Sequence, residues 1–495
     1  MNNGTLLAAV DLGSNSYRLE IGRYEQGLIE RVEYRKETIR QGSGLDDARR
    51  LTPEAMQRGW DCLARFAERL AGFPRTQVRA VATQTLREAR NRDEFLVRAH
   101  QVLGFPIDVI AGREEARLIY LGVAHLLPQS DEKRLVVDIG GRSTELILGR
   151  GFEAEVTESY RVGCVSWSQK YFPDGEFTPA GFERAEVAAK AVLDEAVDRY
   201  ARSDWEHAYG ASGTIGAVVD VLAAAGWPPG QIPRDGLLWL RETLLQAGHA
   251  DRVKLAGLKE DRRPVIGGGL AVLLAIFELL EIDVMHEALG ALRQGVLYDL
   301  LDREHGDTDL RGATVRRLAS SFQVDAAQAQ RVDAVAVQLL DALVGSGRSA
   351  EADRRRRKLS WAAQLHEIGT RISHTDYHRH GAYVLENADA PGFAQWELHR
   401  LGLLVLGHRG KLRKLEADFE DDVFVHQLLA LRLAVILCHA RRDPDLSGIS
   451  LSTRGRQITL SMAPEWARRY PQSAHLLREE AVAWQKTGRS LSVEG

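Results

Sequence analysis

The sequence predicts an α/β protein with two similar lobes, followed by an all-helical region and a small C-terminal module. The first observation is an internal repeat: residues 6–22 (LLAAVDLGSNSYRLEIG) and 135–149 (LVVDIGGRSTELILG) each read as an apolar run, an Asp, a Gly-containing polar turn with Ser, and a second apolar run. The second observation is that strand and helix patterns alternate after each repeat. The third is that strand patterns give way to helical periodicity after about residue 311.

Each repeat predicts a strand, a tight turn and an antiparallel strand. In the first lobe, Thr52 followed by Pro53 is an N-cap and a first-turn proline, which predicts a helix to Leu70. Asn91 predicts the N-cap of a second helix, which stops at Gly104. The other elements expected in this lobe are strands at 78–83 and 107–110 and a helix from about 113.

The second lobe continues in the same way, with strands expected at 152–160, 208–209 and 284–288 and a long helix at 178–201. Helical periodicity then runs to about residue 440, and one hairpin is expected near the end, pairing 449–451 with 457–460. We therefore divide the chain into a first lobe (1–130), a second lobe (131–310), a helical domain (311–440) and a C-terminal module (441–495).

Composition favours an ordinary globular protein, with 44% hydrophobic and 27% charged residues. No signal peptide is expected at the N-terminus, and the longest apolar run, 270–282, is too short and too interrupted by charge to span a bilayer. The three cysteines, Cys62, Cys164 and Cys438, have no metal-ligand spacing and indicate reduced thiols in a cytoplasm.

The charge distribution is uneven. The net charge of −4 argues against a nonspecific nucleic-acid binder, and we expect no specific nucleic-acid partner. Residues 311–495 hold 27 Lys and Arg against 21 Asp and Glu, whereas residues 1–310 hold 38 against 48. The C-terminal part is therefore the better place for contacts with a long polyanion.

The two polar turns are candidate anion sites. Glycine lets the backbone approach a ligand and direct successive N–H groups at it, and serine and threonine hydroxyls add donors. A lone turn of this kind is more often a plain hairpin turn, but two equivalent turns in one chain favour a pair that holds one polyphosphate from both sides. The candidate residues are Gly13, Ser14, Asn15 and Ser16 in the first turn and Gly140, Gly141, Arg142, Ser143 and Thr144 in the second.

Several segments together resemble the exopolyphosphatase and guanosine pentaphosphate phosphohydrolase family, which belongs to the superfamily of actin, sugar kinases and heat-shock ATPases. These segments are DLGSNS (11–16), TLREA (85–89), GREEARLIYLG (112–122), VDIGG followed by STEL (137–146), VGCVSW (162–167) and GASGT (210–214). The resemblance extends through both lobes and past residue 311. It implies two actin-like (ribonuclease H-like) lobes.

The resemblance also implies roles for individual residues. Glu115 matches the family's general base for water, and a carboxylate suits a task in which the water must be oriented and its proton accepted. Asp138 and Glu145 match the positions that organise Mg²⁺, alongside a possible monovalent cation. Arg87 matches an arginine that contacts phosphate. The alternative reading of Arg87 is a solvated charge at a helix end.

Two glutamates adjoin each other at the start of the helix expected from about 113. From the residues alone, Glu114 and Glu115 both read as carboxylates that complement a helix N-terminus. The resemblance gives Glu114 no chemical role, so its replacement by glutamine should be mild. Arg142 departs from the family, which usually has Gly there; we expect its side chain to leave the turn, either into the cleft, where it would bind phosphate, or toward solvent.

In the helical domain, residues 365–369 (LHEIG) resemble the His-Asp centre of HD phosphohydrolases, with Glu367 in place of Asp. No histidine lies between 306 and 365, so the preceding metal ligand of that centre is missing. We therefore expect an HD-like domain without a catalytic metal.

The reading that follows is a cytoplasmic exopolyphosphatase that releases terminal phosphate from inorganic polyphosphate by Mg²⁺-assisted attack of water. A basic path along the helical domain would hold the rest of the polyphosphate and make cleavage processive. We also expect a homodimer. The alternative is a guanosine pentaphosphate 5′-phosphohydrolase, because nothing in the two lobes separates the activities. A second alternative is a sensor without turnover, and a kinase is the third. Residues 378–393 (HRHGAYVLENADAPGF) favour the exopolyphosphatase members.

Overall fold

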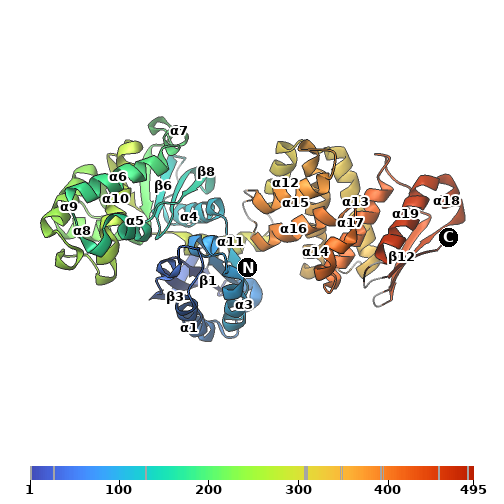
Figure 1. Cartoon of the computed structure of the whole chain (residues 1–495), viewed down its shortest axis with the longest axis horizontal. Helices are drawn as coiled ribbons and strands as arrows, with labels where there is room; N and C mark the ends of the chain where they lie inside the picture. Colours follow the sequence, from blue (N-terminus) through green and yellow to red (C-terminus); the bar gives the residue numbers. More distant parts are fainter. Residues whose placement is uncertain are drawn as a thin grey trace. The chain divides into compact units, whose positions relative to one another are not determined.

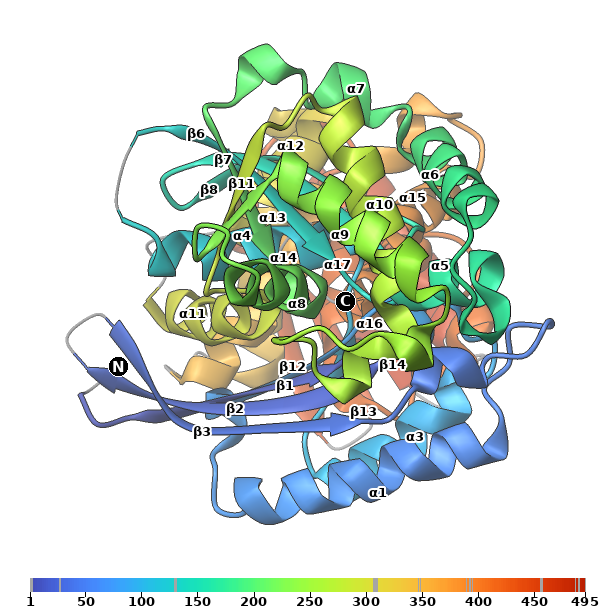
Figure 2. The same ribbon diagram turned by 90° about the vertical axis from the view of Figure 1, so that its left-hand side faces the viewer.

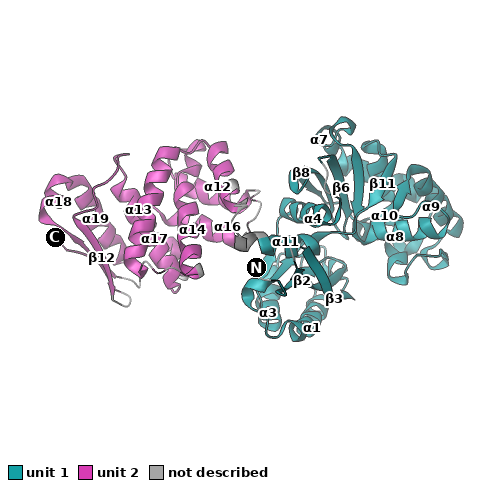
Figure 3. Ribbon diagram, turned by 180° about the vertical axis from the view of Figure 1, so that it is seen from behind, with its two compact units in different colours: residues 1–308 teal, residues 309–495 magenta. Residues whose placement is uncertain are grey.

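The computed structural model describes residues 3–25, 28–128, 131–305, 310–345, 347, 349–388, 390, 393, 395–454, 457–485, 487 and 490–494. The chain forms two compact units, Met1–Thr308 and Asp309–Gly495 (Figure 3). The main boundary expected from the sequence falls between them, although residues 306–309 lie outside the described residues. The two lobes of the sequence analysis both belong to the first unit.

The first unit contains two sheets, and five strands of the second sheet repeat the arrangement of the first (Figure 1). One sheet has the order β3-β2-β1-β4-β5, and the other has β10-β11-β9-β6-β7-β8. Reversed, the second order begins β8-β7-β6-β9-β11, so an antiparallel three-stranded meander joined to parallel strands occurs in both. The strands are β1 (Leu6–Leu12), β2 (Ser16–Glu25), β3 (Leu28–Thr38), β4 (Val78–Ala82), β5 (Ile107–Val109), β6 (Lys133–Ile139), β7 (Thr144–Arg150), β8 (Glu153–Tyr160), β9 (His207–Ala211), β10 (Gln231–Pro233) and β11 (Val284–Glu287).

Helices cover both sheets and also separate them. Helices α1 and α3 pack on one face of the first sheet (Figure 2), α4 and α11 lie between the two sheets, and the remaining long helices pack on the far face of the second sheet. The helices of this unit are α1 (Pro53–Leu70), α2 (Gln84–Glu88), α3 (Arg92–Leu103), α4 (Gly112–Leu126), α5 (Cys164–Tyr171), α6 (Pro179–Leu193), α7 (Ala196–Arg199), α8 (Ser212–Ala224), α9 (Arg234–Ala247), α10 (Ile266–Leu279) and α11 (Leu292–His305).

Strand alternation decides which way the site residues face. Along β1, Leu7 and Ala9 point into the core shared with α4 and α11, while the intervening residues pack toward α1 and α3. Since side chains alternate with a period of two, Asp11 points the same way as Ala9. In β6, Val136 faces this same shared core, which places Asp138 on that face too. The repeat therefore directs both aspartates toward α4.

The helix starts expected from the sequence are present, although one capping prediction was wrong. Thr52 caps α1 by accepting a hydrogen bond from the backbone N–H of Ala55 at 3.3 Å. Asn91 stands at the N-cap position of α3, but its side chain makes no cap bond and pairs instead with the backbone of Leu51, at 2.8 and 3.1 Å. A tertiary contact thus takes the side-chain atoms that the local pattern assigned to the cap.

The second unit is helical with one small sheet. The hairpin expected from the sequence is β12 (Ile449–Arg454) with β13 (Gln457–Met462), and a third strand, β14 (Ser490–Glu494), pairs parallel to β13 without having been predicted. The predicted helical domain and C-terminal module share one hydrophobic core, which includes Leu428, Leu460 and Trp484. The helices are α12 (Leu310–Ser321), α13 (Ala326–Val344), α14 (Ala350–Gln364), α15 (Tyr377–Asn387), α16 (Gln395–Gly407), α17 (Asp422–Leu437), α18 (Pro464–Arg469) and α19 (Pro471–Trp484). Among the described residues, no helix combines the length and the apolar character needed to cross a bilayer.

Candidate active site

The two polar turns lie against each other where β1 meets β2 and β6 meets β7. A Cβ atom placed on Gly141 would lie 3.3 Å from the Cβ of Ser14 and 3.7 Å from that of Asn15, so a side chain at this position would press on the opposite turn. The backbone N–H groups at 13–15 and 141–143 donate to no protein acceptor among the described residues. Each turn therefore presents three successive unused donors near the other turn, which is the chemistry of an anion site.

The hydroxyl side chains of these turns point to different faces of their sheets. Ser16 is buried on the same face of β2 as Arg18, and its hydroxyl has no partner. Ser14 and Ser143 are also buried. Thr144 faces the other way, because it precedes Glu145 by one position in β7, and its hydroxyl donates to the carbonyl of Val162 at 2.6 Å. The Thr144 side chain thus anchors the chain after β8, whereas Ser16 faces the interior between the sheets.

Glu115 lies in the first turn of α4 and is paired with Arg87. Its Oε2 atom accepts a hydrogen bond from Nη1 of Arg87 at 2.7 Å. Arg87 comes from α2 and also donates to the side chain of Gln84 and, at 2.9 Å, to the carbonyl of Ile110. Arg87 is accordingly not a solvated charge at a helix end; it is a half-buried cation fixed against the carboxylate that the sequence assigned as base.

Glu145 and Asp138 stand opposite each other in the β6–β7 ladder. The hydroxyl of Ser159 donates to Oε1 of Glu145 at 2.7 Å. Burial, followed by repulsion from Glu115, raises the pKa of Asp138 to about 7. The same two causes raise the pKa of Glu145 well above its usual range, and burial raises that of Glu115 although Arg87 opposes the shift.

Mutual repulsion among these buried acids means that their negative charge is not fully balanced by protein. Asp11, which the sequence analysis did not name as a site residue, contributes to the raised pKa values of Glu115 and Asp138. A divalent cation would supply the missing positive charge. The described residues hold no group of three His, Cys, Asp or Glu side chains that could enclose a metal. Proteins usually hold Mg²⁺ by one or two carboxylates, with water and substrate phosphates completing its shell.

Glu114 belongs to a different cluster from Glu115. It is 1% exposed, and its two carboxylate oxygens accept hydrogen bonds from Arg117 at 2.8 and 2.9 Å. Arg117 and Arg79 both bind Asp299 of α11, at 2.6 and 2.5 Å. Glu115 therefore points into the site, while the adjacent Glu114 points into a buried ion network that joins α4, α11 and the first sheet.

Arg142 crosses from the second lobe to the first. Its guanidinium donates to the carbonyl of Gly42 and to the carboxylate of Glu88, each at 3.1 Å. The side chain leaves the turn as expected and runs between the lobes, where protein groups of the first lobe hold its guanidinium. Sequence reasoning missed Glu88 as a partner, although it lies in the TLREA segment directly after Arg87.

In the second unit, three buried histidines gather where α15 and α16 meet the end of α14. The ring centroids of His366 and His408 are 5.5 Å apart, and those of His378 and His408 are 6.3 Å apart. Nδ1 of His366 lies 2.7 Å from the carbonyl of Ala363, and Nδ1 of His408 lies 2.6 Å from that of Val405. Burial lowers the pKa of all three, that of His378 to about 4, so they are neutral at pH 7.

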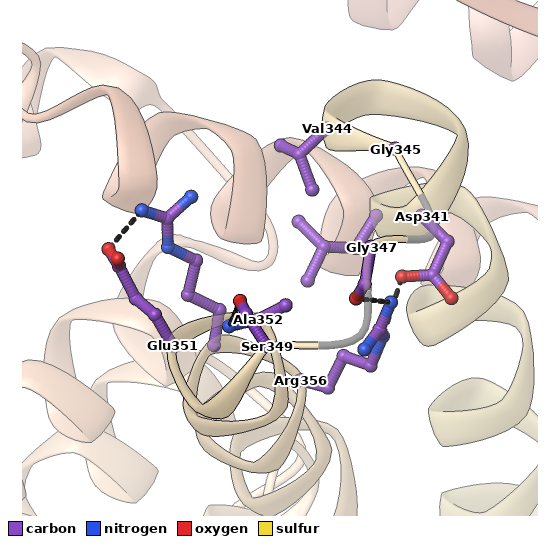
Figure 4. Close-up of a pocket in the computed structure, with 10 residues that line it drawn as sticks. Asp341, Val344, Gly345, Gly347, Ser349, Glu351, Ala352 and Arg356 are labelled. Atoms are coloured by element: carbon purple, nitrogen blue, oxygen red, sulfur yellow. Dashed lines mark hydrogen bonds and ion pairs between the residues drawn. The ribbon is translucent and has the colours of Figure 1, made fainter.

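A small cavity of about 180 Å³ lies elsewhere in the second unit, between the end of α13 and the start of α14 (Figure 4). Its cationic side chains already have partners. Arg356 binds Asp341 at 2.7 Å and the carbonyl of Gly347 at 3.2 Å, and Arg355 pairs with Glu351. Because these charges are satisfied within the protein, the cavity does not compete with the interlobe region as the candidate site.

Comparison with known proteins places this chain in a family. The model of the Ppx/GppA phosphatase family matches residues 21–304, and that of Ppx/GppA phosphatase, domain III, matches residues 310–481. A protein of Vibrio cholerae named guanosine-5′-triphosphate,3′-diphosphate pyrophosphatase is 39% identical over 99% of this chain and 98% of its own. Its namesake in Aeromonas salmonicida is 38% identical over 99% of this chain and 98% of its own.

Two solved structures each match about three fifths of this chain. The crystal structure of the Aquifex aeolicus Ppx/GppA family member is 25% identical, covers 61% of this chain and 99% of its own, and has a TM-score of 0.52. An exopolyphosphatase from Cytophaga hutchinsonii, at 22% identity, covers 60% of this chain and 98% of its own with a TM-score of 0.54, and shows the shared fold. The two lobes have the actin-like fold, and the chain belongs to the Ppx/GppA phosphatase family.

Proposed function

We propose that this protein hydrolyses guanosine pentaphosphate (guanosine 5′-triphosphate 3′-diphosphate) at its terminal 5′ phosphate. The observation that carries the proposal is the full-length similarity to the pyrophosphatases named above, at 38–39% identity over nearly the whole of both chains. Sequence analysis placed polyphosphate first and this nucleotide second. The relatives favour the second reading, so we reverse that order.

In this proposal the terminal phosphate lies between the two polar turns. The unused N–H groups at 13–15 and 141–143 bind its oxygens, and the hydroxyl of Ser16 adds a donor. Phosphoryl transfer needs mainly positioning and charge stabilisation, because the transferred group carries negative charge on its oxygens. Preformed backbone donors supply both, since they need no reorganisation when the reaction occurs.

Glu115 orients the attacking water and accepts its proton. The water oxygen forms a bond to the terminal phosphorus, and the bond from that phosphorus to the bridging oxygen of the next phosphate breaks. The products are orthophosphate and guanosine tetraphosphate, and the water proton passes to the carboxylate of Glu115. Arg87, 2.7 Å from Glu115, holds the carboxylate in place and offers a cation to the transferred phosphate.

Asp138 and Glu145 would hold Mg²⁺, which neutralises charge on the phosphate oxygens when it is bound. The repulsion among Asp138, Glu145 and Glu115 supports this assignment, because a buried acidic cluster is stabilised by a divalent cation.

Inorganic polyphosphate is the second candidate substrate. It presents the same terminal anhydride to the same two turns, and the excess of Lys and Arg over Asp and Glu in residues 311–495 favours contacts with a long anion. The segment 409–414, with four Lys and Arg in six residues, is the densest part of that excess outside 354–358.

The test compares the two substrates on the purified full-length protein. Phosphate release from guanosine pentaphosphate and from long-chain polyphosphate is measured with Mg²⁺, and kcat/KM is compared; Glu115→Gln serves as the inactive control. We expect the nucleotide to give the higher kcat/KM, with guanosine tetraphosphate and orthophosphate as products. A higher value for polyphosphate would reverse the assignment, and no phosphate release from either substrate would return the chain to the sensor reading.

A further inference from the structure

We propose that Arg142 is a positioning residue that joins the two lobes through Glu88, and that it does not act as a phosphate ligand. The kinetic part of this proposal rests on the proposed function, whereas its structural part does not. The starting point is the position of the side chain. It leaves the second turn and reaches the first lobe, where Nη1 donates to the carbonyl of Gly42 and Nη2 to Oε2 of Glu88, both at 3.1 Å.

Both ends of this contact are sheltered from water. The Arg142 side chain is 23% exposed and that of Glu88 is 12% exposed. Glu88 is held on its other oxygen by Nε2 of Gln84 at 2.7 Å, and Arg161, a second cation from the second lobe, lies 3.9 Å from the same oxygen. The carboxylate is therefore fixed within the first lobe and faces two arginines of the second. A charge-assisted pair of this kind, with a carbonyl as second acceptor, uses the planar fork that only arginine has.

Packing confines the arginine stem to a slot between the lobes. A Cβ atom on Gly42 would lie 2.9 Å from Cδ of Arg142, 3.2 Å from Oγ1 of Thr85 and 3.3 Å from Cβ of Ser14. The stem fits because residue 42 is glycine. The stem of Arg142 thus packs directly on the backbone at Gly42, and its guanidinium is held at both ends, by the carbonyl of Gly42 and by Glu88. A connecting residue requires such a fixed side chain, whereas a swinging phosphate ligand does not.

The contact has a direct effect on the catalytic pair. Glu88 follows Arg87 in α2, and Arg87 holds Glu115 at 2.7 Å. Tying Glu88 to Arg142 therefore fixes α2 relative to the second turn, whose unused N–H groups are at 141–143. This connection brings the general base of the first lobe into register with the phosphate donors of the second turn, which belong to the second lobe.

The two possible roles of Arg142 predict opposite changes in KM when the carboxylate of Glu88 is removed. If Arg142 bound phosphate, the carboxylate of Glu88 would compete with the substrate for the guanidinium, and removing the carboxylate would lower KM. If Arg142 connects the lobes, removing Glu88 breaks the connection and raises KM, because a smaller fraction of the protein is in the binding-competent arrangement.

The experiment uses the full-length protein with Arg142→Gly, Glu88→Gln and the double substitution. The control is Glu33→Gln, which removes the ion pairs of Glu33 with Arg69, at 2.7 Å, and with Arg35, at 2.6 Å, both of which lie wholly within the first lobe. We expect each single variant to raise KM for guanosine pentaphosphate about 3- to 10-fold with little change in kcat, and the double variant to be no worse than either, because coupled residues are not additive. The control should match the wild type.

A second measurement does not depend on activity. The N–H of Gly42 donates to the carbonyl of Ser14 at 2.8 Å, and the carbonyl of Gly42 accepts from Arg142. Hydrogen–deuterium exchange of the amides at 40–44 should be faster in Arg142→Gly and in Glu88→Gln, and unchanged in Glu33→Gln.

The outcomes separate the proposals. A lower KM in Glu88→Gln, additive effects in the double variant, or unchanged exchange at 40–44 would each overturn the connecting role. If the wild type releases no phosphate from guanosine pentaphosphate, the proposed function fails, but the exchange data still decide whether Arg142 holds the lobes together.

Discussion

The same substitution at two adjacent glutamates should have opposite consequences. Glu114 and Glu115 are consecutive residues of α4 and both are buried, yet one belongs to an ion network and the other to the site. Glu115→Gln should fold normally and lose turnover. Glu114→Gln should keep its turnover per folded molecule and lose stability. The second effect differs from the mild one that we expected from the resemblance, which gives Glu114 no chemical role.

The magnitudes follow from the contacts. In Glu114→Gln the new amide group faces Nε or Nη2 of Arg117, so one of the two hydrogen bonds at 2.8 and 2.9 Å becomes a contact between two donors. Breaking a buried ion pair costs about 3–5 kcal/mol, and we take about 3 because one acceptor oxygen is kept. The first unit spans 308 residues. With an unfolding entropy of about 2.1 cal/mol/K per residue, that loss lowers Tm by about 5 °C.

Glu115→Gln removes a carboxylate whose pKa is raised, chiefly by burial, which means that the folded state does not favour its charge. No loss of Tm is expected, while loss of a general base lowers kcat by about 10²–10⁴-fold. Differential scanning calorimetry and steady-state kinetics below the transition test both variants.

Three results would refute this reasoning. A Tm for Glu114→Gln equal to that of the wild type would show that the network of Glu114 does not stabilise the unit. Near-normal kcat in Glu115→Gln would remove Glu115 from the mechanism. Loss of turnover in fully folded Glu114→Gln would show that Glu114 takes part in the chemistry, which contradicts the present assignment.

Three further predictions concern metal, pH and domain loss. Asp138→Asn and Glu145→Gln should raise the Mg²⁺ concentration needed for half-maximal rate, and full activity of the wild type in EDTA would refute the assignment. The second unit should lose stability as pH falls from about 6.5 toward 4. In that range His366, His378 and His408 bind protons in the unfolded chain but stay neutral when buried, and burial lowers the pKa of His378 to about 4. Calorimetry of the full chain at pH 7 and pH 5 checks this, and an unchanged transition of the second unit would contradict it. A chain ending at residue 305 should cleave triphosphate-length substrates nearly as the full chain does but lose salt-sensitive activity on long polyphosphate, and equal losses on both would exclude a tethering role for residues 310–495.

The sequence by itself determined the parts of the fold that depend on local pattern. The repeated hairpin with its Asp and glycine turn, the start of α1 at Thr52 and Pro53, and the change to helices after 311 all follow from periodicity and from residues with restricted backbones. The period of two also sets which strand residues share a face, so Asp11 and Asp138 point the same way in their respective sheets. These features are encoded within a few residues.

Only the tertiary structure decided which neighbour each polar side chain meets. Asn91 bonds the backbone of Leu51 and does not cap its own helix, because a residue 40 positions away reaches it. Glu114 and Glu115 read alike along the chain but face different clusters, and Arg142 meets Glu88 because the two lobes fold against each other. The partner of a charged side chain depends on the packing of distant segments, and no local spacing records it.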